Sequence, residues 1–126
     1  MDFAWCIKLR FPHLDVLNVY RSPQLRSKVQ YSRFVDMIDS LIDPSLARPT
    51  MICGDFNYDY WKEPNDVLRV MLDKQQFTQI VTVPTTLNGN CIDHVYLRGL
   101  SHSHKVYYPY YTFHEAVCTM LPYIGH

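Results

Sequence analysis

The stretch Met51–Asp59, MICGDFNYD, joins a short apolar run to four residues that cannot extend a core, Gly-Asp-Phe-Asn. Gly54 allows the backbone to turn sharply where the predicted strand ends. Asp55 and Asn57, two positions apart, point to the same side if the chain stays extended. Ligands collect beyond the carboxyl ends of strands in α/β sheets, and an acid beside an amide suits a hard cation and a phosphate oxygen. The alternative is a plain turn, because Gly-Asp-x-Asn is also favourable turn chemistry.

Length and composition limit the protein to one small domain. It has 126 residues, 48% of them apolar, which is enough to bury a core. The 12 basic and 12 acidic side chains give a formal net charge of zero. The composition therefore does not support a large positively charged surface for binding nucleic acid, although a local basic edge would be enough for such binding. No apolar run approaches the about 20 residues that cross a bilayer.

The chain start and the cysteines predict an intracellular protein, nuclear or cytoplasmic, with no membrane partner. The first ten residues, MDFAWCIKLR, lack the pattern of a signal peptide. The cysteines are scattered, none in a CxxC pair, and each lies in an apolar or strand-like stretch, so we expect reduced, buried thiols rather than a zinc site. They are Cys6, Cys53, Cys91 and Cys118.

Hydrophobic periodicity predicts an α/β or α+β layered domain. A hairpin link at Pro12–His13 joins the first two strands, and Asn88–Gly89 forms a later turn. Ser22 and Pro23 are expected to begin the first helix, and Asn65 to cap the second. The expected strands cover 4–9, 14–20, 50–53, 80–83, 91–97, 105–111 and 115–121, and the expected helices 24–42 and 66–75.

Two further places carry polar groups of interest. Asp93 and His94 are adjacent in a strand-like run, so only one of them faces any one site, and we expect this to be Asp93. A carboxylate there can orient a histidine. His114 precedes the last predicted strand and can act as a general base or bind a phosphate. The alternatives are a solvated strand edge for Asp93 and a merely exposed or structural role for His114.

Together these motifs are more specific than any one alone. The order YRSP, ICGDFN, PTTLNGNCIDHVYL, TFHEAV resembles the C-terminal half of the endonuclease/exonuclease/phosphatase superfamily, and is most similar to the endonuclease domains of non-LTR retrotransposons. The resemblance implies the C-terminal part of a four-layer α/β/β/α sandwich with mostly antiparallel or mixed sheets. Residues 1–126 would then form one partial domain that lacks its N-terminal half.

The resemblance also implies a reaction and roles. The reaction is hydrolysis of a phosphodiester in DNA, assisted by Mg²⁺ or Mn²⁺. Tyr20 matches the tyrosine that contacts the scissile phosphate. Asp55 matches the aspartate that lies near the metal and activates water, and Asn57 the asparagine that stabilises the transition state. Asp93 matches the aspartate that pairs with the catalytic histidine, which is His114.

Two departures from the family pattern affect the predicted metal site. Phe113 stands where the family has an aspartate near the metal, and the principal glutamate ligand, which belongs to the family's N-terminal half, has no counterpart. A half-sandwich would also expose apolar sheet surface, which the missing N-terminal half or another chain would need to cover.

Two alternative functions follow. One is a non-catalytic remnant that binds nucleic acid or protein, for which the tyrosines at 107, 108, 110 and 111 offer stacking surfaces. The other is a phosphatase acting on an inositol phosphate or a lipid head group, because the site chemistry is shared and substrate choice lies in the loops.

Overall fold

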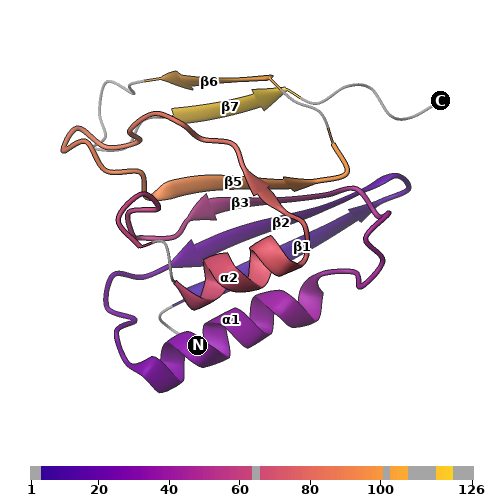
Figure 1. The fold of residues 1–126 in the computed structure, drawn as a ribbon, viewed down its shortest axis with the longest axis horizontal. Helices are drawn as coiled ribbons and strands as arrows, with labels where there is room; N and C mark the ends of the chain where they lie inside the picture. Colours follow the sequence, from indigo (N-terminus) through magenta and orange to yellow (C-terminus); the bar gives the residue numbers. More distant parts are fainter. Residues whose placement is uncertain (1–3, 64–65, 101–102, 108–115, 121–126) are drawn as a thin grey trace.

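A mixed five-stranded sheet organises the protein. The computed structural model describes residues 4–63, 66–100, 103–107 and 116–120. The strands are β1 (Ala4–Phe11), β2 (Leu14–Arg21), β3 (Thr50–Asp55), β4 (Thr78–Gln79), β5 (Asp93–Arg98), β6 (Ser103–Tyr107) and β7 (Ala116–Met120), and the helices are α1 (Lys28–Leu41) and α2 (Val67–Lys74) (Figure 1). Within these ranges neither helix is long and apolar enough to cross a membrane.

The sheet has the strand order β1-β2-β3-β5-β4. The hairpin β1–β2 is antiparallel, as predicted from the Pro12–His13 link. Strands β2 and β3 are parallel, which requires a crossover, and α1 provides it. Strands β3–β5 and β4–β5 are antiparallel, and β6–β7 form a separate antiparallel pair. The predicted α+β class with a mixed sheet is therefore confirmed.

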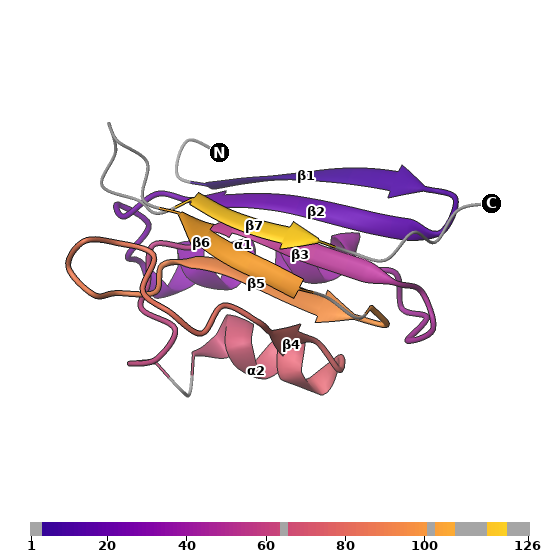
Figure 2. The same cartoon turned by 90° about the horizontal axis from the view of Figure 1, so that it is seen from above.

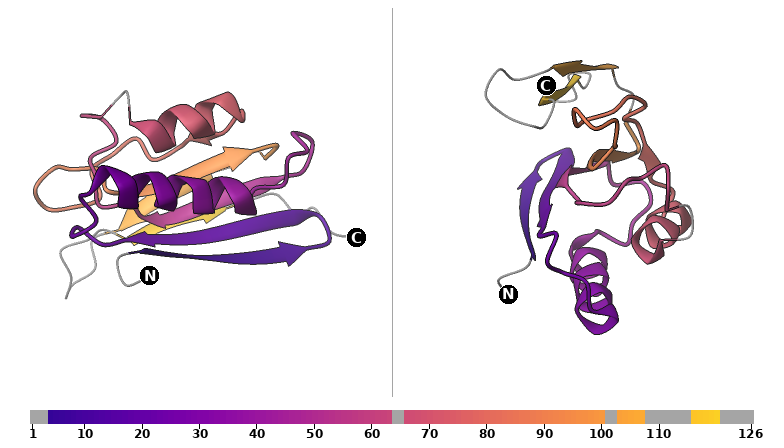
Figure 3. Two further views of the ribbon diagram at one scale, coloured as in Figure 1. Left: turned by 90° about the horizontal axis from the view of Figure 1, so that it is seen from below. Right: turned by 90° about the vertical axis from the view of Figure 1, so that its left-hand side faces the viewer.

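The two faces of the five-stranded sheet are covered differently. Helices α1 and α2 lie on one face, and the β6–β7 pair lies on the other (Figure 3). Seen from above, β6 and β7 overlie β3 and β5, whereas β1 and β2 remain in open view (Figure 2). We call this second face the open face.

The core lies between the sheet and the helices. Strand alternation turns Leu17, Val19, Ile52 and Tyr96 toward the helices, where they are buried. The helical spacing of buried residues in α1, such as Phe34 and Ile38, and in α2, such as Leu68 and Leu72, supplies the other half of the core.

The open face of β1 is apolar. Trp5, Ile7, Leu9 and Phe11 alternate along the strand and are 45%, 54%, 52% and 49% exposed. β1 is also one of the two edge strands of the five-stranded sheet. An edge strand with a continuous apolar row is a surface that other polypeptides can cover.

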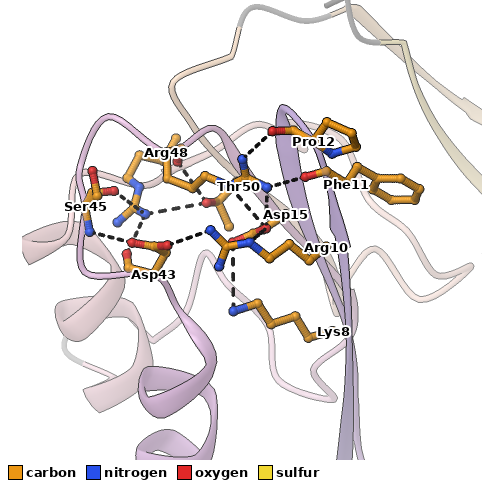
Figure 4. A network of polar contacts seen from close by, with 10 residues as sticks. Lys8, Arg10, Phe11, Pro12, Asp15, Asp43, Ser45, Arg48 and Thr50 are labelled. Carbon is orange, nitrogen blue, oxygen red and sulfur yellow. Dashed lines mark hydrogen bonds and ion pairs between the residues drawn. The ribbon is translucent and has the colours of Figure 1, made fainter. Parts of the chain in front are cut away.

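A buried ion network fastens one end of the sheet (Figure 4). Asp15 is fully buried, and the Arg48 guanidinium lies 2.8 Å from its carboxylate. Arg48 also donates to the carbonyl oxygens of Pro12, at 2.8 Å, and Phe11. Arg10 and Lys8 lie 3.8 and 3.9 Å from the same carboxylate. The network therefore joins the β1–β2 turn to the segment between α1 and β3.

Several predicted element ends were wrong. α1 begins at Lys28 with Ser27 as its N-cap, because the chain first turns at Ser22 and buries Leu25 in the core. α2 is capped by Asp66, whose carboxylate accepts from the amides of residues 68 and 69, and Asn65 lies outside the described residues. The run 80–83 is not a strand. Its backbone turns, with the amide of Val81 bonded to the Gln79 side chain, and β4 is confined to 78–79.

Candidate functional site

Three of the predicted site residues form one row across the central strands β2, β3 and β5, at the end of the sheet where β3 finishes and β5 begins. Tyr20 is the Cα partner of Asp55 in the parallel pair β2–β3, and Asp55 is the partner of Asp93 in the antiparallel pair β3–β5. Adjacent strands lie about 5 Å apart, and residues in register share a face. Trp5, the partner of Tyr20 on β1, stacks on its ring at 5.9 Å between centroids. The row lies on the open face, and its three predicted members are partly exposed.

Gly54 permits this arrangement. Its φ is +152°, and a Cβ added there would lie 1.8 Å from the carbonyl oxygen of Val19 on β2. Any side chain would therefore force β3 away from β2 one residue before Asp55. The prediction of a sharp turn at Gly54 is therefore wrong, because the glycine lies inside β3 in register with Val19 and His94 and the chain turns only after Asp55.

Asn57 reaches the site by a turn rather than along an extended strand. Its φ is 51°, and its backbone N–H donates to Asp55 Oδ1 at 3.0 Å. The expectation that Asp55 and Asn57 share a side of an extended chain is therefore wrong. The Asn57 side-chain amide instead donates to the carbonyl of Arg21, the residue after Tyr20. The amide carries a second N–H that this bond does not use.

Phe56 fixes the centre of the turn. It is fully buried among the helix-side residues, and its ring stacks on His94 at 4.9 Å between centroids and 8° between planes. Its backbone N–H donates to the carbonyl of Ile92 at 2.9 Å. The turn that carries Asp55 and Asn57 is thus attached to the segment that leads into Asp93.

His94 lies on the face opposite Asp93, as the strand alternation predicted. It is fully buried, and burial lowers the pKa of its imidazole to about 4. Its Nε2 lies 2.9 Å from the Cys91 carbonyl oxygen and 3.2 Å from that of Tyr58. Both neighbours are acceptors, so Nε2 carries the proton of a neutral ring.

Comparison with solved structures identifies the fold. The sequence matches no protein-family model and no curated protein. Among solved structures, the endonuclease domain of TRAS1, a telomere-specific non-LTR retrotransposon, aligns with 94% of this chain at a TM-score of 0.63 and 13% identity. CdtB, the biologically active subunit of cytolethal distending toxin, aligns with 89% of this chain at a TM-score of 0.58 and 15% identity.

The chain has the endonuclease/exonuclease/phosphatase fold. The predicted fold is thereby confirmed for the part that this chain covers, and one of the structural neighbours is a retrotransposon endonuclease domain, the group that the motifs resemble most. The chain spans 49% of the CdtB chain and 61% of the TRAS1 chain.

Sequence reasoning missed one residue that shapes this part of the endonuclease/exonuclease/phosphatase fold. Thr85 is fully buried, and its hydroxyl oxygen accepts from the backbone amides of Ile92 and Asp93, both at 3.1 Å. Its own amide donates to the carbonyl of Asn90 at 2.9 Å. Thr85 therefore holds the start of β5, where Asp93 stands. The signal was a small hydroxyl residue directly after Pro84, in a segment that reads only as a turn.

The donor chemistry of the site fits Mg²⁺ in part. Asp55 and Asp93 provide two carboxylates on neighbouring strands, and Mg²⁺ is commonly held by one or two carboxylates together with water and phosphate oxygens. The described residues contain no group of three or more metal-ligating side chains. His114 and Phe113, the other two positions with predicted consequences for this site, lie outside the described residues.

Proposed function

We propose that this chain is the C-terminal part of a metal-dependent phosphodiesterase that acts on DNA as an endonuclease. The observation that carries the proposal is the row formed by Tyr20, Asp55 and Asp93 on the open face, with Asn57 held at its edge. The structural neighbours add support, because the TRAS1 domain is itself an endonuclease.

Each residue of the row has chemistry that suits phosphodiester hydrolysis. Water attacks phosphorus, the bond to the leaving oxygen breaks, and that oxygen takes up a proton. Asp55 would accept a hydrogen bond from the attacking water and orient it. The second side-chain N–H of Asn57 and the Tyr20 hydroxyl would donate to phosphoryl oxygens, where negative charge accumulates. Asp93 would orient the imidazole of His114.

We propose Mg²⁺ or Mn²⁺ as the cofactor, with Asp55 as the ligand that this chain provides. The cation would supply positive charge to the phosphoryl oxygens. Phe113 cannot ligate a metal, and the family's glutamate has no counterpart in the sequence. We therefore propose that further ligands come from polypeptide that this chain does not contain.

We propose that an N-terminal half, or another chain in its place, packs against the exposed row of β1 that Trp5 begins and Phe11 ends. Two observations support this. The structural neighbours are longer than the aligned region, and β6–β7 already form a second layer over β3 and β5.

One observation favours the non-catalytic alternative, a remnant that binds nucleic acid or protein. Asp55 and Asn57 take part in turn hydrogen bonds with each other and with Arg21, which explains their presence without catalysis. An enzyme requires the Asp55 charge, whereas a remnant requires only its hydrogen-bond acceptor. A test must therefore separate the charge from the acceptor.

The substitution Asp55→Asn makes this separation, because asparagine keeps an oxygen that accepts from the Asn57 amide. The measurement is Mg²⁺-dependent nicking of supercoiled plasmid by the purified chain, beside Asp73→Asn on α2 as a matched remote control. Because Asp55 is the ligand that this chain provides, we expect residual nicking from the wild type and the control, weaker than that of a complete domain, and none from Asp55→Asn. Equal nicking by all three proteins would exclude this site. No nicking by folded wild-type protein would favour the remnant, and the assay would be repeated with the upstream sequence restored.

A further inference from the structure

His94 belongs to a closed ring of hydrogen bonds on the helix-facing side of the sheet, opposite the candidate site. Nε2–H of the ring donates toward the carbonyls of Cys91 and Tyr58. A neutral imidazole with its proton on Nε2 has an acceptor at Nδ1, which lies 2.9 Å from the Tyr96 hydroxyl. Tyr96 therefore donates to Nδ1. Its oxygen then accepts from the Tyr58 hydroxyl at 3.3 Å, so that Tyr58 both begins and ends the ring.

The contacts of His94 connect two segments that are far apart in sequence. On one side they reach the turn after β3, directly through the stacked ring of Phe56 and the carbonyl of Tyr58, and through Tyr96 to the Tyr58 hydroxyl. On the other side they reach the segment before β5, through the Cys91 carbonyl. The first segment carries Asp55 and Asn57, and the second leads directly to Asp93.

Direct backbone hydrogen bonds also join the two segments. The amide of Phe56 donates to Ile92, and the amide of Tyr60 donates to the carbonyl of Cys91 at 3.0 Å. The Cys91 carbonyl thus accepts from both Tyr60 and His94. An apolar ring at position 94 would fill the space, but it would leave buried polar groups of both segments without their partner.

We propose that His94 is a positioning residue for the hydrolysis proposed above. It holds the turn that bears Asp55 and Asn57 at a fixed distance from Asp93 on β5. The inference rests on the proposed function for its catalytic consequence, whereas the mechanical connection between the two segments can be measured independently. His94 contacts no substrate in this assignment, because it lies on the helix-facing side of the sheet.

Two substitutions separate the hydrogen bonds from the packing. His94→Phe keeps an aromatic ring to stack on Phe56 and removes all three polar contacts described above. His94→Gln keeps an N–H donor at about the reach of Nε2 and should retain part of the hydrogen-bonded connection between the two segments. Leu72→Ala is the control, because it opens a cavity in the core under α2 and removes none of the side-chain hydrogen bonds of His94.

The first measurement is amide hydrogen exchange of Phe56 and Tyr60, relative to the amides of β1–β2 in the same protein. We expect about tenfold faster relative exchange in His94→Phe, an intermediate value in His94→Gln, and no relative change in Leu72→Ala. Unchanged relative exchange in a folded His94→Phe protein would overturn the proposed connection. If His94→Phe does not fold, the comparison of His94→Gln with wild type decides the question in the same way.

The second measurement is the steady-state nicking rate. In His94→Phe we expect kcat to fall by about a hundredfold with a much smaller change in KM, because misplaced groups lose transition-state contacts first. Partial rescue by His94→Gln supports the assignment. Wild-type kcat in His94→Phe would overturn it. An inactive wild type would instead count against the proposed function, and the exchange measurement would then decide the mechanical connection by itself.

Discussion

The side-chain amide of Asn57 donates a hydrogen bond to the backbone carbonyl of Arg21, the residue that follows Tyr20. This bond ties the turn after β3 to the end of β2, while the register of the sheet aligns Tyr20 with Asp55. Asn57 can stand in this turn because its side chain is one of the few that tolerate a left-handed backbone, here with a φ of 51°. One residue therefore serves both the turn and the candidate site.

Two substitutions at Asn57 separate the backbone effect from the amide effect. Asn57→Gly keeps the left-handed conformation and loses only the amide, which we expect to cost about 1 kcal/mol of unfolding free energy. Asn57→Ala adds backbone strain and should cost about 2 kcal/mol. Both variants should lose nicking. Urea unfolding and the plasmid assay check these values, and a fully active Asn57→Gly protein would show that the amide serves the turn alone.

Gly54 should be among the least replaceable residues of the chain. Gly54→Ala places a Cβ 1.8 Å from the carbonyl oxygen of Val19, so we expect a loss of about 4 kcal/mol or more, or no folded protein. Gly89→Ala is the matched control. Gly89 has a φ of +84° with no atom within 4 Å of the added Cβ, so only backbone strain of about 1 kcal/mol applies. Similar thermal stability of the two variants would contradict the close approach of β2 and β3.

The burial of His94 predicts a specific acid sensitivity. Its pKa falls from 6.5 to about 4 on folding, so the unfolded state binds the proton more strongly. The contribution of the neutral His94 to the free energy of unfolding is fully present above pH 6.5. It is lost as the pH falls through 4, by about 3 kcal/mol in total. Urea unfolding of wild type and His94→Gln between pH 7 and pH 4 isolates the effect. The difference in unfolding free energy between the two proteins should shrink or reverse as the pH falls. A difference that stays constant with pH would be evidence against a buried neutral imidazole.

Asp15 and Arg48 should dominate the stability of the far end of the sheet (Figure 4). Asp15→Asn removes the charge that faces Arg48, whose side chain is only 14% exposed, and we expect a loss of about 3 kcal/mol. Lys62→Ala is a surface control. Lys62 is 75% exposed and 3.9 Å from Asp59, so its loss should cost less than about 1 kcal/mol. Chemical denaturation compares them, and equal small losses would mean that the network contributes little.

The sequence predicted those features that depend on local pattern. Alternation gave the hairpin of β1 and β2, and the apolar run before Gly54 predicted β3. Alternation also indicated that Asp93 and His94 face opposite sides, which the burial of His94 agrees with. Motif order singled out Tyr20, Asp55 and Asp93, which the structure aligns in one row.

The features that escaped prediction depend on contacts between distant segments. Ser27 caps α1 because the burial of Leu25 delays the helix, and nothing local reveals that burial. The hydroxyl of Thr85 finds its partners at the start of β5, and the left-handed Asn57 finds its own at the end of β2. Such partners are fixed only once the sheet has assembled.

The most direct test of the central claim is to locate where Mn²⁺ binds on the folded chain. The measurement is paramagnetic broadening of backbone amide signals in a two-dimensional NMR spectrum at substoichiometric Mn²⁺, for wild type and Asp55→Asn. We expect the amides of Tyr20, Asp55 and Asp93 to broaden first, and Asp55→Asn to abolish this selectivity. Broadening spread over exposed acids such as Asp36, or identical patterns in both proteins, would contradict a cation site in this row.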